Sequence, residues 1–178
     1  MKVRDIKAFI RDVPDFPRKG ILFKDITTLI KNKDAFNATI NMFYDHYRGE
    51  KIDVVVAIEA RGFIFGGALA YRLGCGFVPI RKPHKLPSES LHEEYQLEYG
   101  KDALEIHTDA IQPGLNVLIL DDLLATGGTI NAACKLVEKL GGVIIGLAFL
   151  IELTFLKGRE SLKKYEVYSM ISCDSEKD

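Results

Sequence analysis

The chain has 178 residues, 47% of them hydrophobic, and a formal net charge of −1. This length suits one compact domain, and no Pro-, Ser- or Gly-rich linker divides it, so we expect a single domain over residues 1–178. The lack of a basic excess argues against a nucleic-acid-binding surface. The longest apolar stretch, Val143 to Ile151, is far shorter than the ~20 residues that cross a membrane, so we expect no membrane contact.

The N-terminal segment and the cysteines favour a cytoplasmic protein. Lys2, Arg4 and other charged residues interrupt the N-terminal segment, which therefore lacks the apolar core of a signal peptide. The three cysteines are widely spaced and contain no C-x-x-C pair, so reduced thiols are the simplest interpretation.

Hydrophobic periodicity predicts alternating helices and strands. An amphipathic helix over residues 3–12 and an irregular Pro/Gly segment form a small N-terminal hood, residues 1–33. The core, residues 34–172, contains predicted helices over 34–47, 62–73, 130–140 and 156–163, and predicted strands over 52–58, 77–80, 117–120, 143–151 and 167–171. A polar segment, 81–100, interrupts this order, and residues 173–178 form a polar tail. The alternation is typical of a doubly wound α/β domain with a mainly parallel sheet.

The segment from Val117 to Thr129 is the most informative part of the chain. Val117 to Leu120 suits a buried parallel strand, and Asp121 and Asp122 follow at its predicted end, where α/β sheets bind ligands. The next turn has little side-chain bulk, so its backbone N–H groups can form an anion-binding nest before a helix N-terminus. The residues of this turn are Ala125, Thr126, Gly127, Gly128 and Thr129. Carboxylates for vicinal hydroxyls beside a nest for phosphate predict a ribose 5-phosphate site, and the missing Gly-Lys-[Ser/Thr] ending excludes a P-loop.

In its form Asp-Asp-Leu-Leu-Ala-Thr-Gly-Gly-Thr, this segment resembles the 5-phosphoribosyl-1-pyrophosphate (PRPP) signature of type I phosphoribosyltransferases, above all of their adenine-specific members. The resemblance implies the fold of that family and transfer of the 5-phosphoribosyl group from PRPP to adenine, which gives AMP and pyrophosphate in purine salvage. It also implies a homodimer, and Mg²⁺ that enters bound to PRPP rather than at a metal site of the protein. The motif Gly62-x-x-x-Gly66-Gly67 would let a helix pack closely against a partner.

Two further polar clusters follow predicted strands and should meet the first at one sheet edge. Glu59, Ala60 and Arg61 resemble the pyrophosphate loop of the adenine-specific group, which implies a cis peptide bond near Glu59-Ala60. In the second cluster, the expected pyrophosphate contacts are Arg81, Lys82 and Lys85. Without the resemblance, both clusters would be interpreted as turn and surface residues.

Residues 82–100 are predicted to form a mobile loop, because long loops in compact domains often serve as lids. The stretch Leu97-Glu98-Tyr99-Gly100-Lys101 resembles the end of the mobile loop in the adenine-specific group, where the glutamate faces the base. Glu98 is therefore the candidate catalytic acid/base, together with Asp121 and Asp122 as catalytic carboxylates. The alternative for Glu98 is an exposed strand carboxylate.

The segment from Phe16 to Thr27 resembles the base-binding stretch of the family, which commonly has a second proline where this chain has Lys19. By resemblance, Phe23 stacks on the purine, and backbone groups of Leu22 and Lys24 bind its edge. Two alternatives remain at this point: a family member specific for xanthine or hypoxanthine, and a PRPP-sensing regulator without catalytic activity. The regulator would normally carry a helix-turn-helix and a basic face, which the sequence lacks.

Overall fold

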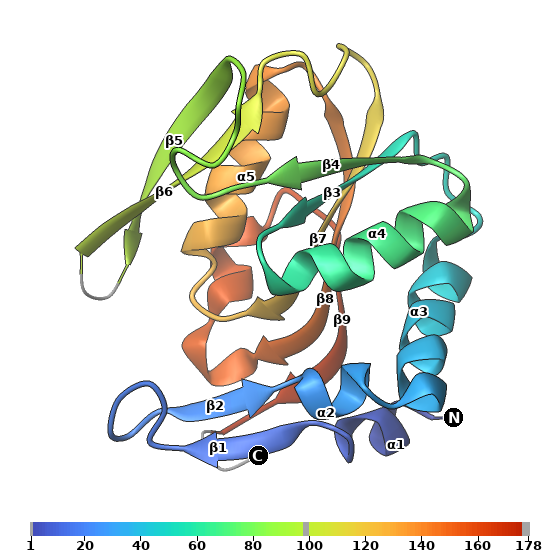
Figure 1. Ribbon diagram of the computed structural model, residues 1–178, viewed down its shortest axis with the longest axis vertical. Coiled ribbons are helices and arrows are strands. Elements are labelled where there is room, and N and C mark those ends of the chain that lie inside the picture. Colours follow the sequence, from blue (N-terminus) through green and yellow to red (C-terminus); the bar gives the residue numbers. More distant parts are fainter. Residues whose placement is uncertain (1, 98–99, 176–178) are drawn as a thin grey trace.

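The structure is a computed structural model that describes residues 2–97 and 100–175. A five-stranded parallel sheet in the order β4–β3–β7–β8–β9 forms its centre (Figure 1). These strands are β3 (Val54–Ile58), β4 (Gly76–Ile80), β7 (Asn116–Leu124), β8 (Val143–Leu153) and β9 (Val167–Cys173). β3 is buried along its whole length, as the continuous apolar runs of the sequence predict for a sheet covered on both faces.

Helices cover both faces of the sheet, so the predicted doubly wound architecture is confirmed. Alternate strand residues face opposite sides: Val55 and Leu118 belong to one core cluster, and Val56 and Ile119 to the other. The first cluster includes residues of α1 (Val3–Lys7), α2 (Thr27–Ile30), α3 (Lys33–Tyr47) and α4 (Arg61–Leu73). The second includes α5 (Gly128–Lys139). In Figure 1 the sheet runs between α5 on the left and α3 and α4 on the right. No helix within the described ranges is long and apolar enough to span a membrane.

Two antiparallel strand pairs lie outside the central sheet. β1 (Arg11–Pro14) pairs with β2 (Leu22–Asp25), and β5 (Ser90–Leu97) pairs with β6 (Gly100–His107). Figure 1 shows the two pairs on the same side of the molecule, at opposite ends of its long axis. The β1–β2 pair belongs to the predicted hood.

The prediction of one helix over residues 3–12 is wrong, because α1 ends at Lys7 and residues 11–14 form β1. Contacts with β2 decide the conformation of this segment. Lys24 Nζ lies 2.8 Å from Asp12 Oδ1, and the Arg11 guanidinium is paired with the Asp25 carboxylate. Such long-range pairing overrides the local helical pattern.

The prediction of an irregular segment over residues 81–100 is also wrong from Ser90 onward, where β5 begins. Glu93 concealed the strand, since it places a charge among the inward-facing residues of β5. In the structure its carboxylate bridges two lysines of α5, Lys135 Nζ at 2.8 Å and Lys139 Nζ at 2.7 Å. Leu104 and Ile106 of β6 are fully buried in the core cluster that contains α5. The pair is therefore docked on α5 by both apolar and ionic contacts.

Other boundaries differ by smaller amounts. β7 continues through Asp121 and Asp122 to Leu124 instead of ending at Leu120, because it pairs with β8 as far as Leu124–Glu152. The predicted helix over residues 156–163 is replaced by two 3-10 helices, η1 (Thr154–Leu156) and η2 (Gly158–Leu162). α5 begins at Gly128, two residues before the predicted start.

Candidate functional site

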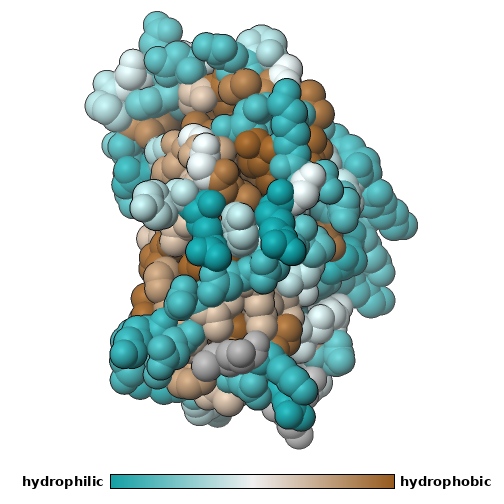
Figure 2. All heavy atoms as spheres, turned by 90° about the vertical axis from the view of Figure 1, so that its right-hand side faces the viewer, coloured by the Kyte–Doolittle hydropathy of each residue, from teal (hydrophilic) through white to brown (hydrophobic). Residues whose placement is uncertain are grey.

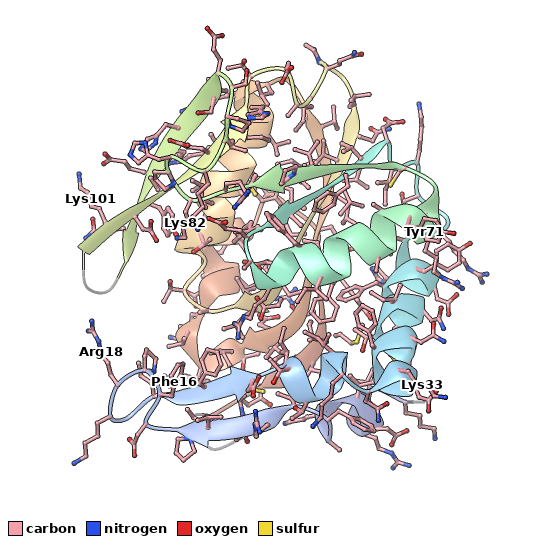
Figure 3. All side chains as sticks on the ribbon, viewed as in Figure 1. Phe16, Arg18, Lys33, Tyr71, Lys82 and Lys101 are labelled. Carbon is pink, nitrogen blue, oxygen red and sulfur yellow. The ribbon has the colours of Figure 1, made fainter. Side chains whose placement is uncertain are left out.

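The residues predicted to bind PRPP come from the carboxyl ends of β3, β4 and β7 and the starts of α4 and α5, and the residues predicted to bind the base, Leu22, Phe23 and Lys24, lie on β2. The two antiparallel pairs flank this edge of the sheet. In Figure 3, Phe16 and Arg18 project from the loop between β1 and β2, on the same side as Lys101 of β6, while Lys82 lies between β6 and α4. The site is thus framed by the sheet edge and by two outlying strand pairs.

The small-residue turn forms the N-terminal end of α5. Gly127 has a φ of +88°, a left-handed conformation that favours glycine, and it is the N-cap of the helix. Among the described residues, no side chain caps this end. The first N–H groups of a helix have no partner within the helix, so here they are available to an anion. A Cβ atom at Gly128 would lie 3.1 Å from the carbonyl oxygen of Gln96, so β5 lies close to this turn.

The two aspartates are held beside the start of α4. Asp121 Oδ1 accepts a hydrogen bond of 2.9 Å from the Asp122 amide and lies 2.9 Å from the position a Cβ atom would take at Gly62. Arg61 Nη2 lies 2.9 Å from Asp122 Oδ2, as an ion pair. Apart from this ion pair, that buried oxygen accepts no hydrogen bond from the described part of the chain.

Burial raises the pKa of both carboxyl groups. For Asp121 the negative charge of Asp122 raises the pKa further, well above its usual range. For Asp122 the Arg61 guanidinium opposes the effect of burial. Because the two groups interact, they titrate as a pair.

Arg61 extends toward a pocket next to the aspartates. Its guanidinium donates a hydrogen bond of 3.3 Å to the Lys24 carbonyl and lies 4.9 Å from the centre of the Phe23 ring. Arg61 therefore contacts Asp122, one of the carboxylates predicted to bind ribose, and Lys24 of the predicted base-binding strand. Its predicted role in binding pyrophosphate remains a prediction.

A cavity of about 300 Å³ lies beside the turn. It is lined by the predicted base-binding residues Leu22, Phe23 and Lys24, by Arg61, and by apolar residues that sequence analysis did not assign to the site: Leu123, Leu153, Phe155 and Leu156. Ala125 of the small-residue turn also lines it. The apolar run from Val143 to Ile151, which ends just before Leu153, was the sequence signal nearest to this far wall, and it specified no role.

The backbone of β2 offers hydrogen-bonding groups to this cavity. The groups of successive residues on a strand alternate between its two edges, and the Lys24 carbonyl is turned away from β1 toward Arg61. By the same alternation, the backbone groups of Leu22 face that open edge as well. Leu22 and Lys24 therefore have backbone groups at the open edge of β2, and their role in binding the base stays a prediction.

The predicted pyrophosphate cations are paired with carboxylates. Arg81 Nε lies 2.7 Å from Glu59 Oε2, Lys85 Nζ lies 3.3 Å from Glu59 Oε1, and the Lys82 amide donates to the same carboxylate. Burial alone would raise the pKa of Glu59, but these donors outweigh it and lower the pKa. The peptide bond between Glu59 and Ala60 is cis, as the resemblance implied.

Lys82 itself turns toward β6. Its ammonium group pairs with the Asp102 carboxylate and donates to the Tyr95 hydroxyl at 2.8 Å. Burial would lower the pKa of Lys82, but these two partners raise it. Nothing in the sequence indicated this link, because Tyr95 and Asp102 lie in β5 and β6, which were not predicted.

The remaining candidates are Glu98, the cysteines and the glycines of α4. Glu98 lies outside the described residues, so its predicted role is untested. The three cysteines are free, as expected for reduced thiols. Gly62 and Gly66 pack against this chain's own sheet: a Cβ atom at Gly66 would lie 2.6 Å from the Cβ of Ala57. The expectation that these glycines face a partner subunit is wrong.

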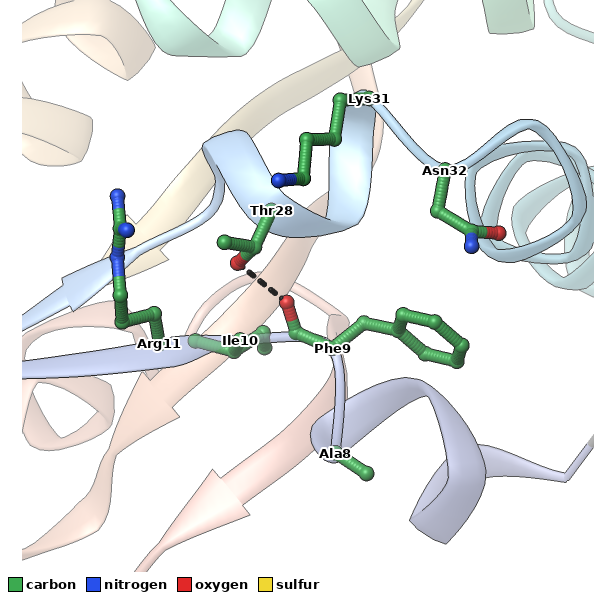
Figure 4. A pocket seen from close by; sticks show the side chains of 7 residues that line it. All are labelled: Ala8, Phe9, Ile10, Arg11, Thr28, Lys31 and Asn32. Carbon is green, nitrogen blue, oxygen red and sulfur yellow. Dashed lines mark hydrogen bonds between the residues drawn. The ribbon is translucent and has the colours of Figure 1, made fainter.

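A second cavity of about 430 Å³ lies in the hood (Figure 4). It is lined by residues outside the predicted site: Ala8, Phe9, Ile10, Arg11, Thr28, Lys31 and Asn32. Thr28 Oγ1 donates a hydrogen bond of 2.6 Å to the Phe9 carbonyl across it. Its position gives it no part in the site described above.

Comparisons with known proteins agree with the geometry. A family model described as the phosphoribosyl transferase domain matches residues 25–178. The adenine phosphoribosyltransferase of Chloroflexus aurantiacus is 59% identical over 171 residues, 96% of this chain and 99% of that protein. The crystal structure of adenine phosphoribosyltransferase from Thermoanaerobacter pseudethanolicus has a TM-score of 0.95 at 57% identity, with 97% of this chain and all of that chain covered. A Giardia lamblia structure, described as complexed with 9-deazaadenine, has a TM-score of 0.93 at 39% identity and covers 98% of this chain and 99% of its own.

Proposed function

The chain belongs to the adenine phosphoribosyltransferases of the phosphoribosyl transferase family, and we propose how its residues carry out that reaction, the transfer of the 5-phosphoribosyl group from PRPP to adenine. The reaction gives AMP and pyrophosphate and salvages the base. One observation carries the assignment of roles: the anion-binding turn and the apolar cavity are contiguous, since Ala125 belongs to both and Arg61 joins the cavity to Asp122.

The 5′-phosphate binds at the start of α5. Amide groups of the turn Ala125–Thr129 donate to its oxygens, and the Thr126 and Thr129 hydroxyls add two donors. The partial positive charge of the helix N-terminus adds a favourable interaction with the phosphate. Asp121 and Asp122 accept hydrogen bonds from the ribose hydroxyls, and the burial of Asp122 beside the Arg61 guanidinium supports this role.

Mg²⁺ enters bound to PRPP. Carboxylate oxygens are the ligands that this cation prefers, so the donors that Asp121 and Asp122 offer fit it, directly or through water. When bound, the cation eases departure of the pyrophosphate by neutralising its growing charge. Until then the ion pair with Arg61 keeps Asp122 in place, and the Asp122 amide donates to Asp121.

Arg81, Lys82 and Lys85, with Arg61 and the backbone of Glu59-Ala60, bind the pyrophosphate. In the ligand-free protein Glu59 and Asp102 neutralise these cations. PRPP binding therefore exchanges carboxylate partners for phosphate oxygens, whose higher charge makes the exchange favourable. The site must also exclude water while positive charge develops at the anomeric carbon. Residues 82–100 were predicted to be the lid; since β5 within this range is docked on α5, we propose that the part of it before β5 closes the site.

Adenine binds in the 300 Å³ cavity. Phe23 stacks on the ring, and backbone groups of Leu22 and Lys24 pair with the amino group at C6 and the acceptor at N1. Hypoxanthine and guanine reverse both groups, so they would leave buried polar groups unpaired, a discrimination that reaches about 10⁴–10⁵ in favourable cases. Glu98 exchanges a proton with the imidazole ring of the purine as the new bond forms.

A homodimer is proposed through the exposed face of α4 and β4. Tyr71 is 91% exposed, and Ile64 and Phe77 are each 38% exposed on this side of the molecule. Figure 2 shows the corresponding view, in which hydrophobic surface interrupts the hydrophilic residues, and Figure 3 shows Tyr71 projecting outward. Clustered apolar surface of this kind is typical of protein interfaces. Light scattering of wild-type protein and of Tyr71→Asp tests the proposal: a dimer that the substitution weakens supports it, and a wild-type monomer contradicts it.

The activity is tested by measuring nucleotide formation from PRPP and Mg²⁺ with adenine, hypoxanthine, guanine and xanthine in turn. AMP formation with adenine alone is the expected result. Faster turnover of a 6-oxopurine would contradict the base assignment, and tight PRPP binding without turnover of any base would support the regulator.

A further inference from the structure

The backbone of the phosphate-binding turn is braced from behind by side chains outside the signature motif. Gly127 starts α5 without a capping side chain in the described structure, so the turn needs another means to hold its shape. Asn131 supplies one. Its Nδ2 group donates a hydrogen bond of 3.0 Å back to the Gly127 carbonyl, which also accepts the Asn131 amide at 3.0 Å.

The direction of this carbonyl decides where an amide points. The Gly127 C=O and the Gly128 N–H belong to one planar peptide unit, and in a trans peptide the two groups point in opposite directions. A donor that holds the carbonyl on the helix side therefore holds the Gly128 N–H on the ligand side. Gly127 needs such a constraint more than other residues do, because glycine has the widest choice of backbone conformations.

η2 continues the brace. Asn131 Nδ2 also donates to Ser161 Oγ at 2.7 Å, and the Ser161 hydroxyl donates to the Gly158 carbonyl at 2.8 Å. Gly158 packs directly on the turn: a Cβ atom there would lie 2.2 Å from the Ala125 carbonyl oxygen and 3.1 Å from the Gly127 nitrogen. η2 and the turn are thus fitted together backbone to backbone.

Arg159 ties η2 to the central sheet. Its guanidinium forms two hydrogen bonds with the Glu152 carboxylate of β8, at 3.0 and 2.5 Å, and donates to the Val167 carbonyl of β9 at 2.9 Å. A bidentate pair of this kind has a fixed geometry. A continuous set of contacts therefore runs from the sheet through η2 and Asn131 to the phosphate-binding turn.

We infer that Asn131 and Ser161 are positioning residues that fix the Gly127–Gly128 peptide so that its N–H group faces the 5′-phosphate. The inference rests on the proposed role of the turn in phosphate binding. In this arrangement neither side chain touches the substrate, so Asn131 and Ser161 affect binding only through the backbone of the turn. The effect should appear for ligands that carry the phosphate and be absent for the base.

The test measures ribose 5-phosphate affinity by calorimetry, together with kcat and the KM values for PRPP and adenine. Asn131→Ala should weaken ribose 5-phosphate binding and raise the KM for PRPP by about 5- to 20-fold, since one or two hydrogen bonds are lost. The KM for adenine and kcat should stay near the wild-type values. Asn37→Ala is the matched control. The Asn37 side chain also forms a hydrogen bond with a residue four positions away, Asn41, but it lies in α3, far from the turn in the sequence.

A second pair of variants keeps the test independent of folding defects in Asn131→Ala. Ser161→Ala should weaken ribose 5-phosphate binding by a smaller factor, about 2- to 5-fold, and Ser161→Thr should restore it because the hydroxyl is kept. Adding Ser161→Ala to Asn131→Ala should cost little more, since both act through one network.

The inference is overturned if Asn131→Ala binds ribose 5-phosphate normally, if it loses both substrates equally, or if Ser161→Thr is as weak as Ser161→Ala. Gly128→Val distinguishes this failure from failure of the proposed function. If Gly128→Val binds normally, the turn is not the phosphate site. If Gly128→Val is weak and Asn131→Ala is normal, only the brace is wrong.

Discussion

The two regions that meet PRPP are built in different ways. The phosphate-binding turn is made of backbone, and it is fixed by packing against η2 and by the hydrogen bond from Asn131 to Gly127. The pyrophosphate region is made of long cationic side chains, which Glu59 and Asp102 neutralise in the ligand-free protein. A preformed backbone site pays little to bind its ligand, whereas paired side chains must first exchange partners. We therefore propose that the phosphate anchors the substrate and that the pyrophosphate end completes the site.

The largest expected effect concerns the chemical step and the segment between β5 and β6. Glu98→Gln should lower kcat by about 10²–10⁴-fold, because the amide can still form hydrogen bonds but cannot readily exchange a proton. Single-turnover kinetics at saturating adenine and PRPP–Mg²⁺ measures this step. Glu94→Gln is a control, since Glu94 is an exposed carboxylate of β5 paired with Lys101. An unchanged chemical step in Glu98→Gln would make Glu98 an ordinary surface carboxylate.

The preformed character of the turn predicts the next effect. Gly128→Val should weaken PRPP binding by about 100-fold without unfolding the domain, because a side chain there blocks the approach of phosphate to the backbone amides. It would also press on the Gln96 carbonyl, 3.1 Å from the Cβ position. Calorimetric titration with PRPP checks the loss. Gly49→Ala is the control, since the described structure leaves open space around that position. Near-normal PRPP affinity of Gly128→Val would contradict the assignment of the turn as a preformed phosphate site.

The base cavity should respond independently of both phosphate regions. Phe23→Ala should cost roughly 1–3 kcal/mol of adenine binding and leave PRPP affinity almost unchanged, by analogy with base–aromatic stacking elsewhere. Calorimetry with each substrate separates the two effects. Phe23 lines the cavity and is only half-buried, so its loss should not disturb the core. Equal losses for adenine and PRPP would show that Phe23 has a structural role instead.

The smallest effect has the opposite sign. Asp102→Asn removes the carboxylate that competes for Lys82, so pyrophosphate should bind more tightly, by about 2- to 5-fold, since partly exposed ion pairs are worth little. Product inhibition by pyrophosphate measures the change, with Glu94→Gln again as the control on the same strand pair. Weaker or unchanged inhibition would mean that Asp102 orients Lys82 for the ligand. It would contradict the proposal that Lys82 exchanges Asp102 for pyrophosphate oxygens.

The same contrast explains how much the sequence could predict. The strands of the central sheet and the phosphate-binding turn depend on local features, such as the apolar run before Asp121 and the small residues Gly127 and Gly128, so they were predicted well. Contacts between distant segments were not. Glu93 hid β5 because its partners, Lys135 and Lys139, lie on α5.

The contacts that a long side chain makes could not be predicted from the sequence either. Arg61 follows the end of a strand, like the other cations predicted to bind pyrophosphate, yet its guanidinium lies against Phe23 and Asp122. Similarly, the spacing of Gly62 and Gly66 indicates close packing but does not say against what, and the structure gives the chain's own sheet as the answer. Spacing fixes which residues share a face, and only the fold decides what that face meets.

The most direct test is a pair of crystal structures, one without ligand and one with PRPP and Mg²⁺ bound. The backbone of residues 125–131 should superpose in the two states and keep the hydrogen bond from Asn131 to Gly127, while Arg81 and Lys82 leave Glu59 and Asp102 for the pyrophosphate. A turn that is rebuilt on binding, or cations that remain paired with their carboxylates in the complex, would contradict the account.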